Sequence, residues 1–137
     1  MRLSAEEART RFVAAPVARL ATVSAAGQPH LVPIVFAADG DVIYSAVDRK
    51  PKSTTALRRL ANIAANPAVA VLVDHYADDW TRLWWARADG TARIAEAAEA
   101  ERALDRLTAR YPVYREQRPP GPVVAVDVAR WSGWSAG

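Results

Sequence analysis

Two lysines stand two residues apart at the start of a predicted helix, and they are the strongest candidates for ligand binding in the sequence. Lys50 and Lys52 come just before Ser53 and Thr54, whose hydroxyl groups are suited to capping a helix. The free backbone N–H groups of a helix N-terminus favour anions. Cations, hydroxyl groups and backbone donors therefore converge at one point, which predicts a site for a phosphate or another polyanion. The alternative interpretation is two solvated loop cations.

A second basic pair, Arg58 and Arg59, follows in the same predicted helix. Adjacent helical positions are about 100° apart, so only one of these side chains can face a given ligand. The other is expected to be solvated.

No side chain is predicted to be catalytic, and no metal site is predicted. The sequence has no cysteine and only two histidines, His30 and His75, and the carboxylates near His75 are those expected at a solvated strand end. A glycine-rich phosphate loop, a serine nucleophile elbow and a dinucleotide fingerprint are all missing from the sequence. If the protein is an enzyme, a bound cofactor therefore supplies the chemistry and the protein supplies the pocket.

The composition is that of one globular domain over residues 1–137, with 51% hydrophobic and 24% charged residues. A net charge of +3 favours an anionic ligand but does not indicate a nucleic-acid partner. No apolar run approaches the ~18 residues of a membrane span, and the N-terminus has the pattern of a helix start and not of a signal peptide. We expect a soluble, cytoplasmic protein with a small-molecule substrate and no membrane partner.

The first half of the chain predicts a helix and three strands. Ser4 and Glu7 form a capping-box pattern for a helix over residues 4–14. Strands are predicted over 18–23, 29–37 and 42–47, joined by turns at 25–28 and 39–41, which together make an antiparallel meander. Two prolines in the second strand place it at an edge of the sheet, or where the missing N–H groups face something other than a neighbouring strand.

The second half predicts two more helices and the remaining strands. A helix over 53–65 ends at Asn66-Pro67, and the apolar run 69–74 is expected to be a strand buried on both faces. Strands over 80–87 and 91–95 are separated by a turn at 89–90. A helix over 96–111, a loop over 112–122 and a last strand over 123–128 follow. Trp84 and Trp85 must point to opposite faces of their strand, one to the core and the other to a partner or a ligand.

These elements predict a mainly β (α+β) fold, a small barrel of six or seven antiparallel strands with three helices at its openings. The segments RLATVSAAGQPHLVPIVF and DGDVIYSAV, the basic helix ending at Asn-Pro and the strand VLVD resemble the pyridoxamine 5'-phosphate oxidase-like split β-barrel flavoproteins over nearly the whole chain. The segments KPKSTTALRRLANIAANP and LVDHYADDWTRLWWARADG resemble the actinobacterial branch of that family, which is thought to use the deazaflavin coenzyme F420.

The resemblance implies a homodimer with two cofactor sites at its interface. The residues that it implies around the cofactor ring are His30, Val32 and Pro33, with Ser45, Ala46 and Val47 beside them and Trp80 and Arg82 from the other subunit. For the phosphate, counting from the preceding strand selects Arg49 and Lys50, whereas counting from Asn66-Pro67 selects Arg58 and Arg59. We expect Lys50, Lys52 and Thr54 to bind it, helped by Arg58, because the helix start must stay near the strand that holds the ring.

The implied function is an F420-dependent oxidoreductase that transfers a hydride between the reduced coenzyme and a small, conjugated organic substrate. The alternatives are an FMN-dependent oxidase or reductase of the same fold and a non-catalytic F420-binding protein.

The double change Lys50→Ala and Lys52→Ala is expected to weaken cofactor binding by roughly one to three orders of magnitude. The reason is that a charge-assisted hydrogen bond to an anion contributes about 1.5–3 kcal/mol. Stability should change by no more than about 0.5 kcal/mol, because both residues are predicted in an exposed loop. Equilibrium titration at several salt concentrations measures this, and an unchanged affinity would move the phosphate to Arg58 and Arg59.

Overall fold

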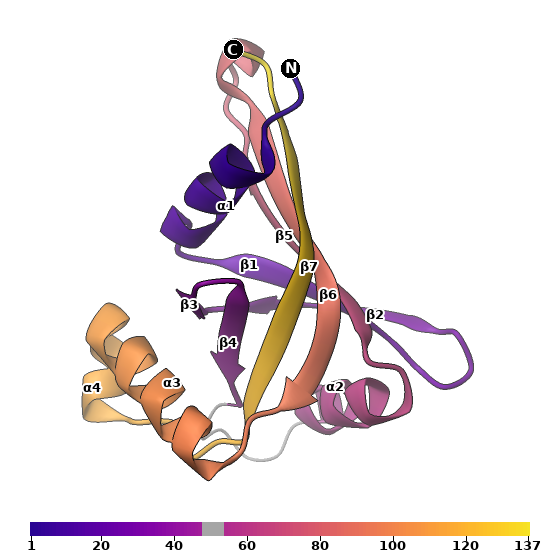
Figure 1. The fold of residues 1–137 in the computed structure, drawn as a ribbon, viewed down its shortest axis with the longest axis vertical. Coiled ribbons are helices and arrows are strands. Elements are labelled where there is room, and N and C mark those ends of the chain that lie inside the picture. The colour runs from indigo at the N-terminus through magenta and orange to yellow at the C-terminus, as the bar shows by residue number, and fades with distance from the viewer. Residues whose placement is uncertain (48–53) are drawn as a thin grey trace.

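The computed structural model describes residues 1–47 and 54–137, with the side chains of 54–57 also outside the description. In this part of the chain seven antiparallel strands form one curled sheet (Figure 1). The strands are β1 (Ala18–Val23), β2 (Pro29–Ile34), β3 (Ala37–Asp39), β4 (Val42–Ala46), β5 (Ala68–His75), β6 (Trp84–Ile94) and β7 (Val123–Ser135). The helices are α1 (Ala5–Ala14), α2 (Thr54–Ala65), α3 (Ala97–Arg110) and α4 (Pro112–Glu116), with a 3-10 turn η1 (Trp80–Arg82).

The sheet is a split barrel because one continuous segment supplies both of its edges. Its strand order is β2-β1-β5-β6-β7-β4-β3, so β2 and β3 lie at opposite edges. These two strands are separated in the chain by only Val35 and Phe36. The sheet must therefore curl so that its two edge strands, β2 and β3, come together at the corner that Val35 and Phe36 form.

The predicted meander is wrong for that reason. β1 pairs with β2 and β3 pairs with β4, but β4 pairs with β7 on its other side and not with β2. The predicted strand 29–37 breaks at Phe36, whose side chain is fully buried and whose backbone groups bond to side chains of the α3 end. The edge position that the two prolines predicted for β2 is confirmed.

Gly90 marks a bulge in a continuous strand and not the predicted turn. β6 runs through Asp89 and Gly90 with a shift in its register against β7. A Cβ atom at Gly90 would collide with the backbone carbonyl oxygen of Asp127, so the close approach of two strands requires glycine here. One long strand therefore replaces the two predicted ones, and β7 extends beyond its predicted end to match it.

The strand β5 is buried on one face only, which corrects the prediction that both faces are covered. Val69, Val71 and Val73 point into the barrel, whereas Leu72 on the other face is 37% exposed. The main contacts of the helices α1 and α2 lie elsewhere, since α2 packs against β1 and β6 and α1 against β6 and β7. An apolar run alone does not distinguish a covered strand from one with a bare face.

The helices follow their sequence signals with one exception. The Ser4 hydroxyl group accepts the Glu7 backbone N–H and caps α1, and α2 ends directly before Asn66-Pro67, as predicted. The predicted loop 112–122 contains a fourth helix, α4, so the expected number of three helices is wrong. Pro112 is the first residue of α4, where a missing N–H costs little.

Two cores lie on the two sides of the sheet. The barrel interior is filled by side chains from α1 and the strands, including Phe12, Leu20, Phe36 and Val71. A second cluster packs α3 onto the outer side of β4 and β7, including Tyr44, Leu104, Leu107 and Ala125. Trp84 packs against the first core, as predicted for one of the pair, and Trp85 lies opposite Trp134 on the other face; its contact with a partner or ligand stays a prediction.

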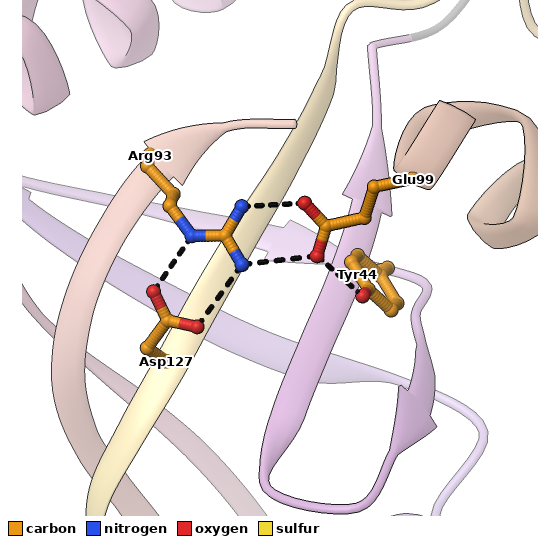
Figure 2. A network of polar contacts seen from close by, with 4 residues as sticks. All are labelled: Tyr44, Arg93, Glu99 and Asp127. Atoms are coloured by element: carbon orange, nitrogen blue, oxygen red, sulfur yellow. Dashed lines mark hydrogen bonds and ion pairs between the residues drawn. The ribbon is translucent and has the colours of Figure 1, made fainter. Parts of the chain in front are cut away.

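A polar network fixes the N-terminal end of α3 to the sheet (Figure 2). The Arg93 guanidinium group on β6 donates to Asp127 on β7, at 2.7 Å from Nε to Oδ2, and to both carboxylate oxygens of Glu99 on α3. The Tyr44 hydroxyl group on β4 donates to Glu99 Oε2 at 2.7 Å. The hydrogen bonds from Arg93, then that from Tyr44, lower the pKa of Glu99 to about 2. Burial, then the Glu99 hydrogen bond, raises the pKa of Tyr44 to about 12.

The variant Glu99→Gln is expected to lose stability at neutral pH and part of its sensitivity to acid. The folded pKa of Glu99 lies below its ordinary value of 4.5, so its contribution is fully present above pH 4.5 and is lost as the pH falls toward 2. We expect a loss of about 1 kcal/mol, because the network is partly exposed. Urea denaturation at pH 7 and at steps between pH 4.5 and 2 measures it. The matched control is Glu116→Gln, an exposed carboxylate on α4; equal curves for both variants would contradict the prediction.

Candidate functional site

The candidate site is a pocket of about 310 Å³ in the split between the ends of β2 and β4. Its walls are mostly apolar and come from segments that are far apart in the sequence. The side chains that form these walls are Val17, Pro33, Ile34, Val35 and Ala46. This chain encloses the pocket only in part, which leaves one side open.

Three polar side chains also line the pocket. Ser45 on β4 is buried, with 5% of its surface exposed, whereas Arg59 on α2 and Tyr114 on α4 are half-buried. The pocket thus combines apolar walls with one permanent positive charge and two hydroxyl groups. This combination suits a flat, largely apolar ring that carries an anionic group.

The structure brings together three of the predicted ring residues, Pro33, Ser45 and Ala46. The two strands that carry them are not neighbours in the sheet, and they meet only because the barrel closes. Val47 follows directly after β4 and is half-buried, with its N–H bonded to the Pro122 carbonyl group, and it does not line the pocket.

His30 and Val32 lie on the opposite face of β2 from Pro33, because side chains alternate along a strand. Val32 is part of the barrel core. His30 stands opposite Thr22, which accepts a hydrogen bond of 3.0 Å from Asn62 on α2. The Nδ1 atom of His30 is buried and has no hydrogen-bond partner among the described residues. The structure therefore places His30 at the α2 end of the barrel interior and outside the pocket lining.

Only one of the two adjacent arginines of α2 faces the pocket, as their separation of about 100° around the helix predicts. Arg59 lines the pocket, whereas Arg58 is exposed and is not part of the lining. Lys50 and Lys52 lie outside the described residues, and Thr54 is the first residue of α2 with a side chain outside the description. Counting from Asn66-Pro67 thus reaches one residue that lines the pocket, Arg59, whereas the residues of the other count lie outside the description.

Trp80 and Arg82 lie on η1, at the opposite end of the molecule from α2 (Figure 1). Both side chains are exposed, and 72% of the Trp80 surface is accessible. A single chain therefore does not bring them to the pocket.

Sequence reasoning missed four pocket residues, Val17, Ile34, Val35 and Tyr114. Tyr114 falls in the segment that was predicted to be a loop, and the available signal was Pro112, which often begins a helix. Val17 lies between α1 and β1, and no local pattern marks it. In residues 1–47 and 54–137 no cluster of three or more histidines and carboxylates could hold a metal ion, and no helix there is long and apolar enough to cross a membrane.

Solved structures of distant proteins share this fold. A FAD-binding protein from Mesorhizobium loti is 22% identical, with a TM-score of 0.74 over 97% of this chain and 93% of its own. A FAD-binding protein from Mycobacterium smegmatis is 20% identical, with a TM-score of 0.68 over 98% and 96%. A heme-binding protein from Mycobacterium smegmatis is 19% identical, with a TM-score of 0.74 over 99% of this chain and 60% of its own.

A comparison with curated protein sequences gives no significant match. The family model described as pyridoxamine 5'-phosphate oxidase matches residues 4–135, which is nearly the whole chain. The match covers every strand of the split barrel and all the residues that line the pocket. The chain therefore belongs to the pyridoxamine 5'-phosphate oxidase family.

Proposed function

We propose that this protein is an oxidoreductase that binds the deazaflavin coenzyme F420 in the pocket between β2 and β4. The observation that carries the proposal is the pocket itself, which lies in the split of the barrel and combines apolar side chains with Ser45, Tyr114 and the Arg59 guanidinium group. The basic stretch of the sequence from Arg49 to Arg59 also supports an anionic cofactor, and it offers more positive charge than one phosphate group needs.

The residues present fit such a cofactor. Pro33 and Ala46 offer apolar surface to a flat ring, and the buried Ser45 offers a hydrogen-bonding group beside them. When bound, the cofactor supplies the hydride that is exchanged with the substrate. The described side chains then have the task of binding and orienting the ring and excluding water from one of its faces. Arg59, together with Lys50 and Lys52, would hold the phosphate.

The proposal includes a second copy of this chain, packed on the bare outer face of β1, β2 and β5. This face carries a shallow hollow of about 400 Å³ with an almost wholly apolar lining, in which Leu31 is 67% exposed and Leu72 is 37% exposed. The Arg19–Asp74 ion pair, at 3.4 Å, borders the hollow. Leu31 and Pro33 lie on the same face of β2, so this surface continues toward the pocket. A second copy would cover the apolar face and could bring its Trp80 and Arg82 toward the open side of the pocket.

Two alternatives keep the same pocket. An FMN-dependent oxidase or reductase is favoured by the two structural neighbours described as FAD-binding proteins. A non-catalytic F420-binding protein is the second alternative, and the heme-binding protein of the same fold supports it. Turnover of reduced cofactor with a panel of enones and nitro compounds distinguishes an enzyme from a binding protein.

The protein is expected to bind F420 more tightly than FMN, and Arg59→Ala is expected to weaken that binding by about tenfold or more. The loss of one charge-assisted hydrogen bond to an anion accounts for this magnitude. Fluorescence titration of the wild type and of both variants, Arg59→Ala and Arg58→Ala, measures it.

The comparison of the two arginine variants is the internal control. Both remove one positive charge from the same helix, but only Arg59 lines the pocket. A larger loss for Arg58→Ala would place the phosphate on the other side of α2. FMN bound at least tenfold tighter than F420, which corresponds to about 1.4 kcal/mol, would overturn the choice of cofactor.

The wild type is expected to be a dimer in solution, and Leu72→Asp is expected to shift it to monomers. A carboxylate in the centre of an apolar interface would lose its hydration without gaining a partner. Light scattering at micromolar concentration measures the mass of both proteins. Val113→Asp is the matched control, because Val113 is an exposed apolar residue on α4 and lies off this face. A wild type that is monomeric under these conditions would contradict the proposal.

A further inference from the structure

We propose that Tyr111 is a positioning residue for the pocket, because its hydroxyl group fixes the backbone on both sides of the split. The proposal concerns a residue that does not touch the ligand, since Tyr111 is not part of the pocket lining. This inference depends on the proposed function in one respect, which is that the ligand of the pocket is a flavin-type cofactor.

The corner at Phe36 needs partners that the sheet does not provide. Phe36 is fully buried and lies between β2 and β3, outside both of their hydrogen-bonding ladders. A buried backbone group without a partner is strongly unfavourable. The Phe36 N–H donates to the Tyr111 hydroxyl oxygen at 3.2 Å, and the Phe36 carbonyl oxygen accepts from the same hydroxyl group at 2.9 Å and from Arg110 at 2.7 Å.

The same two side chains hold the segment that leads into β1. The Tyr111 hydroxyl group lies 3.0 Å from the Pro16 carbonyl oxygen, and Arg110 donates to the carbonyl oxygen of Ala15. A phenol has one proton, so Tyr111 donates to Phe36 or to Pro16 at any moment and accepts from the Phe36 N–H in both cases. Tyr111 thus ties together two segments that are separated by twenty residues of sequence.

These two segments are walls of the pocket. Val35 directly precedes Phe36, and Val17 directly follows Pro16, and both line the pocket. Each wall residue is therefore one peptide unit away from a backbone group that Tyr111 holds. A change in the distance between these segments would change the width of the split.

Tyr111 also supports the third wall. Its ring meets that of Tyr114 edge to face, with 6.0 Å between the ring centroids, and Tyr114 lines the pocket from α4. α4 begins directly after Tyr111, so the contacts of Tyr111 also fix the start of that short helix. Figure 1 shows α3 and α4 beside β3 and β4.

Tyr44 provides a matched control for the test. It is also a tyrosine at the junction of α3 and the sheet, and its hydroxyl group also makes one strong hydrogen bond, to Glu99. That bond joins two side chains at the N-terminal end of α3 and, unlike the bonds of Tyr111, it involves no backbone group next to a pocket residue. Tyr111→Phe and Tyr44→Phe thus each remove one hydroxyl group from the same interface and keep the ring.

The experiment compares the wild type, Tyr111→Phe and Tyr44→Phe by three measurements on the full-length protein. Hydrogen–deuterium exchange without cofactor reports on the Phe36 amide, titration reports the Kd for F420 and for FMN, and urea denaturation reports stability. We expect faster exchange at Phe36 and a Kd raised about three- to tenfold for Tyr111→Phe alone. Both variants are expected to lose comparable stability.

The outcomes separate this inference from the proposed function. Unchanged exchange at Phe36 or an unchanged Kd in Tyr111→Phe would overturn the positioning role. An equal rise of the Kd in Tyr44→Phe would also overturn it, because the effect would then follow stability and not the pocket wall. A wild type that binds neither cofactor would refute the proposed function, while the exchange rate at Phe36 would still decide whether Tyr111 fixes the corner.

Discussion

The structure depends on one turn of the chain, the corner at Val35 and Phe36, where a single segment leaves one edge of the sheet and enters the other. The Phe36 ring lies 5.2 Å from that of Phe12, which in turn lies 5.2 Å from that of Trp131. Removal of a phenylalanine side chain from such a core typically costs about 3–5 kcal/mol. Because this aromatic row joins the corner to α1 and β7, the barrel cannot open at the corner without disrupting its core.

Helix α3 packs on the outer side of β4, the strand that carries Ser45 and Ala46 of the pocket. Arg93, Glu99 and Tyr44 fix its N-terminal end, Arg110 and Tyr111 fix its C-terminal end, and Leu104 and Leu107 pack between them on β4 and β7. β4 itself is held by its ladder with β7 and by packing on both faces, since Ile43 belongs to the barrel core and the Tyr44 ring to the outer one. Ser45 and Ala46 are part of the same ladder, so their positions do not depend on the Tyr44 hydroxyl group.

The sequence predicts local structure well and long-range pairing poorly. Caps and amphipathic spacing located three helices, and prolines located the edge strand, because each of these signals acts within a few residues. The turn at Asp39-Gly40 indicates that β3 and β4 are neighbours, but it contains no information that β4 pairs with β7. The role of Gly90 depends on the approach of Asp127, which no local pattern reveals. For the site, a family resemblance identified Pro33, Ser45 and Ala46 from the sequence. Arg59 and Tyr114 could be assigned to the pocket only from the structure, because this requires the rotational orientation of α2 and the position of α4.

The pocket is lined by buried positions of the sheet and by more accessible positions of a helix, and the two tolerate substitution differently. Ser45 and Ala46 are buried with 5% and 7% exposure, and larger side chains there would have to displace a packed core, which typically costs about 1–3 kcal/mol. The wall that α2 provides is different, because Arg59 is only half-buried and its neighbour Arg58 is exposed, where substitutions usually change stability by less than about 0.5 kcal/mol. The sheet therefore sets the shape of the pocket and leaves little room for variation. In the proposed function the charge that meets the ligand comes from α2, so the choice among anionic cofactors is expected to lie in that helix and not in the barrel.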